Sequence, residues 1–356
     1  MERWAPVFVY EGQSFDVADV LLAAIGWGEW QQLELSLAEG LERAERAERM
    51  GQPVPAEEVR REVVAFRRAR GLISGEDFDV WLASRGLKTG DLDEHHARRL
   101  LCDRADADGG RPGDGRSFAD TRAPYKPPKS LPSAELALKE ALLSGALRSW
   151  AERLARCLGA DRALAGDRDS VAADNQARAA LERAAAAAPV SLLGAQAAQR
   201  APRIADLLTA ERRLREITLT CERIERCLAD HALDWRLMRW QQARFASEGA
   251  AREALIWISE QGLSLADVAA MARAPVSEHS AYSGEVPDLA VRLLSAGPGE
   301  PAGPVQEQGE WRLLCLRDCA EPDIEDPTLR ERARDELMDG VLERHLAGRI
   351  AWHDGL

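Results

Sequence analysis

The chain has 356 residues, of which 46% are hydrophobic, so it is long enough for two or three domains and too apolar for a disordered or fibrous protein. Its 47 basic and 60 acidic residues give a net charge of -13, which disfavours binding to the phosphate backbone of nucleic acids or to anionic membranes. The sequence contains neither a run of about 18 apolar residues nor a basic leader, and we therefore expect a cytoplasmic protein. Six scattered cysteines predict free thiols in a reducing compartment.

The first hundred residues predict a short strand followed by a helical domain. Residues 6–10 are rich in β-branched and aromatic side chains and end at Glu11-Gly12, a typical turn pair. From residue 16 onward, apolar side chains recur every three or four positions, which is the spacing of amphipathic helices. We therefore expect a compact helical domain over residues 1–102.

A linker and a helical bundle are expected next. The segment 103–133 consists largely of Gly, Pro and Asp and offers almost nothing to bury, which is typical of a linker. Over residues 134–232, apolar side chains alternate steps of four and three, the spacing at which helices pack along one another. Leu143, Leu147 and Trp150 begin one such seam.

From residue 233 to about residue 320 the pattern changes to that of a small α+β domain. The expected order is β-α-α-α-β-β, with a strand over 235–240, helices over 248–259, 264–272 and 287–295, and strands over 303–305 and 311–316. A helix over 326–347 and a last strand over 349–353 are expected to close the chain. The predicted fold class is α+β, mostly α.

Two motifs in the small α+β domain resemble a known family. Pro298-Gly299-Glu300 and Gly303-Pro304-Val305 match the turn that follows a helix in parvulin-type (PpiC-like) peptidyl-prolyl isomerases. The segment 252–272 resembles the helix pair of the same family. The resemblance implies that residues 233–320 form a parvulin-like domain.

The N-terminal part resembles the helical chaperone domain of SurA-like proteins. The segment PVFVYEGQSFDVADV and the helical run that begins at PVPAEEVRREVV carry this resemblance. It implies that residues 321–356 return to residues 1–102 and that the first and last strands pair. Residues 134–232 match neither family and are expected to be an inserted helical bundle.

The parvulin-like domain is expected to lack catalytic residues. Prolyl isomerisation needs no covalent chemistry, because an apolar pocket with a few polar groups can lower the barrier to rotation about the amide. The resemblance implies two histidines and a Cys or Asp as those polar groups. The first histidine would fall within residues 236–239, the second aligns with Trp311, and the Cys/Asp position lies near 275–278; none matches.

The predicted site is instead a degenerate, apolar groove that binds an extended or helical peptide. Of the 47 basic residues 43 are arginines, which codon bias largely explains. The arginines near the groove, including Arg239, are nevertheless candidates for pairing with carboxylates or carbonyls of a client. The predicted groove residues are Arg236, Met238, Val286, Leu289, Leu294, Trp311 and Arg312.

Trp27 and Trp30, within the glycine-flanked segment GWGEW, are candidates for a second surface that faces a client, because Trp is enriched at binding hot spots. Core anchoring is the alternative. The cysteine and histidine spacings fit no zinc motif, and no phosphate-binding glycine motif is present. We expect neither a metal nor another cofactor.

Together the resemblances imply a chaperone or accessory protein similar to the PpiC-related proteins of bacterial systems that modify ribosomally made peptides. The expected partner is a peptide or an unfolded protein, such as a precursor peptide together with its modifying enzyme; nucleic acid and membrane are not expected partners. Two alternatives stay open. One is an active peptidyl-prolyl isomerase with unconventional residues, and the other is a structural subunit of a modifying-enzyme complex.

Overall fold

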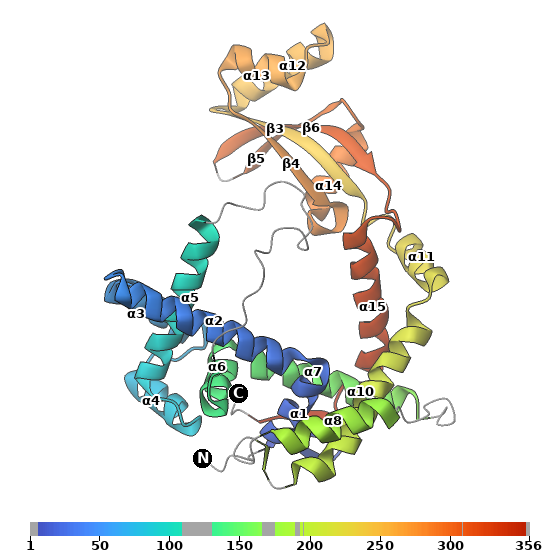
Figure 1. Cartoon of the computed structure of the whole chain (residues 1–356). Coiled ribbons are helices and arrows are strands. Elements are labelled where there is room, and N and C mark those ends of the chain that lie inside the picture. The colour runs from blue at the N-terminus through green and yellow to red at the C-terminus, as the bar shows by residue number, and fades with distance from the viewer. Residues whose placement is uncertain are drawn as a thin grey trace. The chain divides into compact units, whose positions relative to one another are not determined.

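A computed structural model describes residues 6–108, 130–165, 175–188, 193–194, 196–307 and 309–353 (Figure 1). The chain divides into two compact units. Unit 1 comprises Met1–Leu214 and Val341–Leu356, and unit 2 comprises Arg215–Gly340. Most of the predicted linker, residues 109–129, lies outside the described residues, whereas residues 103–108 belong to a helix.

Unit 1 is mostly helical, with one small antiparallel sheet of strand order β2-β1-β7. Its elements are β1 (Pro6–Tyr10), β2 (Gln13–Asp16), α1 (Val17–Trp27), α2 (Glu29–Arg49), α3 (Ala56–Ala69), α4 (Gly75–Ser84), α5 (Thr89–Asp108), α6 (Ala134–Ser144), α7 (Ala146–Ala163), α8 (Asn175–Ala187), most of α10 (Ala197–Thr218) and β7 (Ile350–Trp352). The first strand pairs with the last one, with Phe8 opposite Trp352.

The core of unit 1 is built around α1, whose residues from Ala18 to Ile25 are all buried. The helix begins at Asp16, whose carboxylate accepts hydrogen bonds from the backbone amides of Ala18 and Asp19. This cap satisfies amides that a helix start leaves unpaired. Helices α6, α7, α8 and α10 share one apolar cluster with α1, so these helices of the predicted insertion pack into the same core as the N-terminal strands, whereas its last part, residues 215–232, belongs to unit 2.

Unit 2 contains a four-stranded antiparallel sheet of order β4-β3-β6-β5. Its elements are α11 (Cys221–Asp230), β3 (Leu237–Phe245), α12 (Glu248–Gln261), α13 (Leu265–Ala272), β4 (Val276–Tyr282), a 3-10 turn (Ser283–Glu285), α14 (Pro287–Ala296), β5 (Pro301–Glu307), β6 (Glu310–Ala320) and the first part of α15 (Pro327–Leu346). Helices α12 and α13 cover one face of the sheet and α14 packs on the other (Figure 1).

The observed order in unit 2 is β-α-α-β-α-β-β, so the predicted order β-α-α-α-β-β was wrong by one strand. The missed strand is β4, whose sequence VSEHSAY lies at the edge of the sheet and is largely exposed. An edge strand with polar side chains on both faces lacks the apolar alternation by which strands are recognised in a sequence. The coarse prediction of a mostly helical α+β chain is confirmed.

A third cluster in unit 2 joins α11 to the start of α15. Ile224, Leu228 and Trp235 pack against Leu329 and Ala333.

In the described part of the chain, no helix is long and apolar enough to cross a membrane.

Candidate functional site

The two faces of the unit 2 sheet differ in what they bury. In a strand, successive side chains point to opposite faces. On β3, Ala243 and Phe245 therefore face α12 and α13, whereas Met238 and Trp240 face α14. We call the second surface the α14-side face; it comprises the side chains of Met238, Trp240, Gln242, Ser277, His279, Arg312, Leu314 and Leu316 together with the α14 residues packed on them.

The apolar part of the α14-side face holds the helix in place. Leu293 of α14 is fully buried against Met238, Leu314 and Leu316. Helix α14 begins at Pro287, whose fixed φ favours the first helical turn. This packing fixes the helix on one part of the sheet, beside the strand pair β3–β4.

Polar side chains lie on the same face along β3 and β4. The register places Ser277 directly opposite Gln242 and places His279 directly opposite Trp240. Directly paired residues of an antiparallel ladder have neighbouring side chains on one face. The imidazole of His279 accordingly stacks on the Trp240 indole, with ring centroids 5.4 Å apart and planes inclined by 19°.

Ser277 and His279 form a hydrogen-bonded pair, with Ser277 Oγ 2.8 Å from His279 Nε2. Residues two apart on a strand point the same way, which brings these side chains together. Beneath them Trp240 is 6% exposed, and its buried Nε1 has no hydrogen-bond partner among the described residues. A buried donor without a partner is costly, but Trp27 Nε1 in unit 1 is in the same situation, so this feature alone does not mark a site.

The arginines near the sheet are engaged in ion pairs within unit 2. Arg236 pairs with Glu321, Arg239 with Asp318 and Arg312 with Glu307. Arg312, which is opposite Val305 of β5, belongs to the α14-side face. Each guanidinium has a carboxylate partner within unit 2, so a client carboxylate would have to compete with Glu321, Asp318 or Glu307 for these three arginines.

The structure brings only part of the predicted groove together. Met238, Val286 and Leu289 lie in or against the cluster under α14. Met238 is fully buried and acts as core, and Leu294 of α14 is exposed. Trp311 packs instead against the cluster under α12 and α13, on the opposite face of the sheet.

The two tryptophans proposed for a second surface are located in unit 1. Trp30 is 4% exposed and packs on Trp150, with ring centroids 6.2 Å apart. The prediction that Trp30 faces a client was therefore wrong, because α2 turns this side chain into the core. Trp27 is half-buried against the same core, and the guanidinium carbon of Arg153 lies 4.3 Å from the centre of its ring.

Sequence reasoning missed Trp240, Gln242, Ser277 and His279 as one group. The signal that could have found them is the spacing of Ser277 and His279, two apart in a segment that follows Pro275. That spacing places both side chains on one face only if the segment is a strand. Without β4, the pair had no predicted neighbour on β3.

The cysteines and histidines offer no metal centre. Cys315 belongs to the cluster under α12 and α13, and Cys319 packs on the opposite side of the sheet under α14. Both thiols have a raised pKa, chiefly because burial disfavours the thiolate. Among the described residues, no group of three or more His, Cys, Asp or Glu side chains is placed to hold a metal ion.

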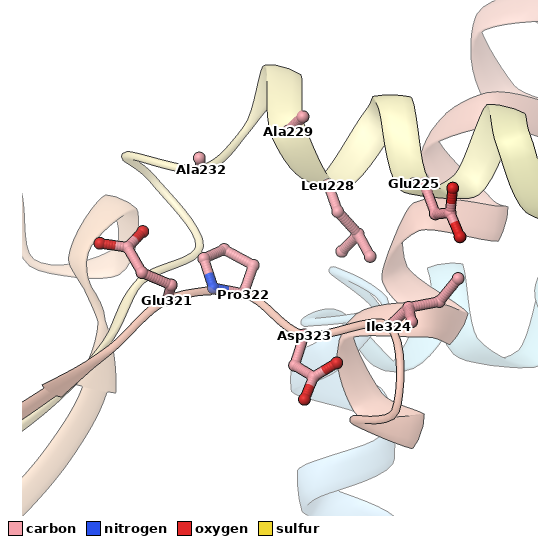
Figure 2. Close-up of a pocket in the computed structure, with 8 residues that line it drawn as sticks. All are labelled: Glu225, Leu228, Ala229, Ala232, Glu321, Pro322, Asp323 and Ile324. Atoms are coloured by element: carbon pink, nitrogen blue, oxygen red, sulfur yellow. The ribbon is translucent and has the colours of Figure 1, made fainter.

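A small cavity of about 260 Å³ lies in unit 2 between α11 and the segment that joins β6 to α15 (Figure 2). Leu228 and Glu225 point from α11 toward this segment, whereas the carboxylates of Glu321 and Asp323 point away from Leu228. Its lining residues are Glu225, Leu228, Ala229, Ala232, Glu321, Pro322, Asp323 and Ile324. Because two of its three lining carboxylates, those of Glu321 and Asp323, point away from Leu228, the α14-side face is the stronger candidate site.

Comparison with known protein families, with curated proteins and with solved structures finds no match to this chain.

Proposed function

We propose that the chain binds peptides through the α14-side face of unit 2, which acts as a parvulin-like domain with a degenerate active site. The observation that carries the proposal is the hydrogen-bonded pair Ser277–His279, whose imidazole stacks on Trp240, a member of the apolar cluster under α14. Polar groups set beside an apolar, aromatic surface are what recognition of a peptide requires.

The order of elements in unit 2 supports the parvulin-like interpretation. The helix pair α12 and α13 occupies the segment that resembles the family's helix pair. Helix α14 follows Gly284-Glu285, and the turn of residues 298–305 leads from it into β5 and β6. The SurA-like interpretation of the terminal parts draws support from the pairing of β1 with β7.

Binding without catalysis agrees with what lies at the two positions where parvulins carry histidines. The position expected for the first histidine falls around Met238, which is buried core. The position expected for the second is Trp311, whose side chain lies on the other face. In the biological role that we propose, the protein is a cytoplasmic accessory factor that holds a ribosomally made precursor peptide for a modifying enzyme.

Replacing Ser277 and His279 together by alanine is expected to weaken peptide binding by about tenfold, a loss of about 1.4 kcal/mol. Both side chains are accessible, so the double variant retains the fold. Binding is measured by fluorescence anisotropy with labelled twelve-residue peptides selected on the wild-type protein from a random library. Arg252→Ala, on the exposed side of α12, is the matched control and should bind as the wild type does. Equal affinities for the double variant and the control would contradict the proposal.

An active isomerase is the second candidate, because Ser277 and His279 offer polar groups beside an apolar surface even though neither occupies a family position. The degenerate-site proposal predicts no acceleration of cis–trans exchange in a standard proline-containing tetrapeptide. A large acceleration that disappears in His279→Ala would instead establish the isomerase.

A further inference from the structure

Strand β4 leaves one edge of the unit 2 sheet open. Within the described residues it pairs only with β3, and all seven of its residues are exposed or half-exposed. Open edges present unpaired backbone N–H and C=O groups that can pair with another chain. The opposite edge strand, β5, carries the features that usually prevent such pairing: it begins at Pro301, contains Pro304 and has an irregular register after Ala302.

The hydrogen bonds at the ends of the β3–β4 ladder identify the outward-facing groups of β4. Arg244 N–H donates to Pro275 O at 3.1 Å, and Ser283 N–H donates to Arg236 O at 3.0 Å. In an antiparallel ladder, hydrogen-bonded pairs recur at every second position, and the register between these ends is regular. Ser277, His279 and Ala281 therefore direct their backbone groups toward β3.

The remaining residues, Val276, Glu278 and Ser280, direct their backbone N–H and C=O groups away from the sheet. No lysine, proline or bulge interrupts this edge. The fourth outward residue, Tyr282, is different, because its N–H donates to the Glu285 carboxylate. Three successive outward residues are enough to pair with a short extended segment.

We propose that an extended, basic peptide segment adds to the open edge of β4 as a fifth strand. This inference rests on the proposed function and specifies how the bound peptide lies. Strand addition supplies affinity through main-chain hydrogen bonds and specificity through alternate side chains. Every second side chain of the added strand lies on the α14-side face, next to Ser277 and His279.

We infer that the peptide is basic because unit 2 is strongly acidic. Unit 2 contains 14 arginines and no lysine against 24 Asp and Glu residues, so it carries most of the negative charge of the chain. Complementary charge accelerates encounter and excludes acidic competitors. Glu278, on β4 itself, is exposed and adds to the negative field along the edge.

Blocking backbone N–H groups, one on β4 and several on the peptide, tests the inference. Ser280→Pro removes an outward N–H of β4 and leaves the pairing with β3 intact, whereas Ser280→Ala removes only the hydroxyl. The probe is the peptide acetyl-RTVRVTR-amide, whose binding is measured by isothermal titration calorimetry. It is compared with a version that is N-methylated at every second residue and with a version in which glutamate replaces arginine. Circular dichroism verifies that the proline variant folds, and the N-methylated probe gives a test that needs no variant.

We expect the probe to bind at least tenfold more weakly to Ser280→Pro than to Ser280→Ala, and the N-methylated probe to bind at least tenfold more weakly to the wild type. Equal binding of both probes to the wild type would overturn strand addition, and equal binding of the glutamate version would overturn the basic specificity. If library-selected peptides bind but acetyl-RTVRVTR-amide does not, the edge inference fails alone. If the wild-type protein binds no peptide at all, both the edge inference and the proposed function fail.

Discussion

Replacing Glu140 by alanine is expected to lower the stability of unit 1 by about 3 to 5 kcal/mol. Glu140 of α6 accepts hydrogen bonds from Arg98 Nη2 and His95 Nδ1 of α5, each at 2.8 Å. Burial alone would raise the pKa of Glu140, but these two partners outweigh it and lower the pKa, so the carboxylate is charged. Without it, the buried Arg98 guanidinium keeps only the exposed Glu94 as an ion-pair partner among the residues that the structure describes.

Glu94→Ala is the matched control for this prediction. Glu94 also pairs with Arg98, at 3.6 Å, but its side chain is 69% exposed. Exposed ion pairs contribute at most about 1 kcal/mol, and we expect a small effect here. Hydrogen exchange of the α5 and α6 amides measures both variants. If Glu140→Ala costs no more than Glu94→Ala, the buried pair does not stabilise the unit.

Acidification from pH 6.5 to pH 4 is expected to destabilise unit 1 through His96. Burial is the main cause that lowers the pKa of His96 to about 4. The nearby positive charges of His95, Arg99 and Arg70 lower this pKa further, whereas the carboxylate of Glu140 raises it. The side chain is 3% exposed, and neither ring nitrogen has a hydrogen-bond partner in the described part of the chain. The ring instead contacts Phe66 edge-on, with centroids 5.7 Å apart.

The sign of the effect follows from proton linkage. The unfolded chain takes up a proton at His96 near pH 6.5, whereas the folded chain does so only near pH 4. Stability therefore falls as the pH falls between these values, by about 3 kcal/mol in all. His96→Gln keeps a polar side chain but does not titrate, so the difference in unfolding free energy between wild type and variant should shrink by that amount from pH 7 to pH 4. A difference that is independent of pH would refute the role of His96.

Local sequence signals were sufficient to predict the helix pair of unit 2 and the strands at its centre. Ser247 and Ser264 precede the two helices and cap them through side-chain hydrogen bonds to backbone amides. These are signals that lie within a few residues of the element they specify. Strand β4 lacks such a signal, since its pairing with β3 depends on residues more than 30 positions away.

The face on which a strand residue lies was the hardest property to predict. Trp311 and Arg312 were both assigned to the groove, but adjacent strand residues point to opposite faces. A shift of one position in the expected register exchanges the two faces entirely. In the structure, Arg312 lies on the α14-side face, and Trp311 lies on the face covered by α12 and α13.

For the helices between residues 134 and 214, the sequence likewise predicted the elements but not what they pack against. Their seams were correctly identified as helical, because apolar spacing is a local property. The helix against which they pack was not predicted. Leu154 and Ile204 are buried in a cluster that includes Leu22 of α1. Helix α1 is apolar except for Asp19, so its sequence gives no face preference from which that contact could be inferred.

The most direct test of peptide binding at the α14-side face is photo-crosslinking from Ser277 in the full chain. A photoreactive phenylalanine replaces Ser277 in one variant and Arg252, on the exposed side of α12, in the other. The peptide is one selected from the random library on the wild-type protein. Peptide binding at the α14-side face predicts at least tenfold more crosslinked peptide from position 277 than from position 252. Equal yields, or a crosslink from position 252 alone, would contradict it.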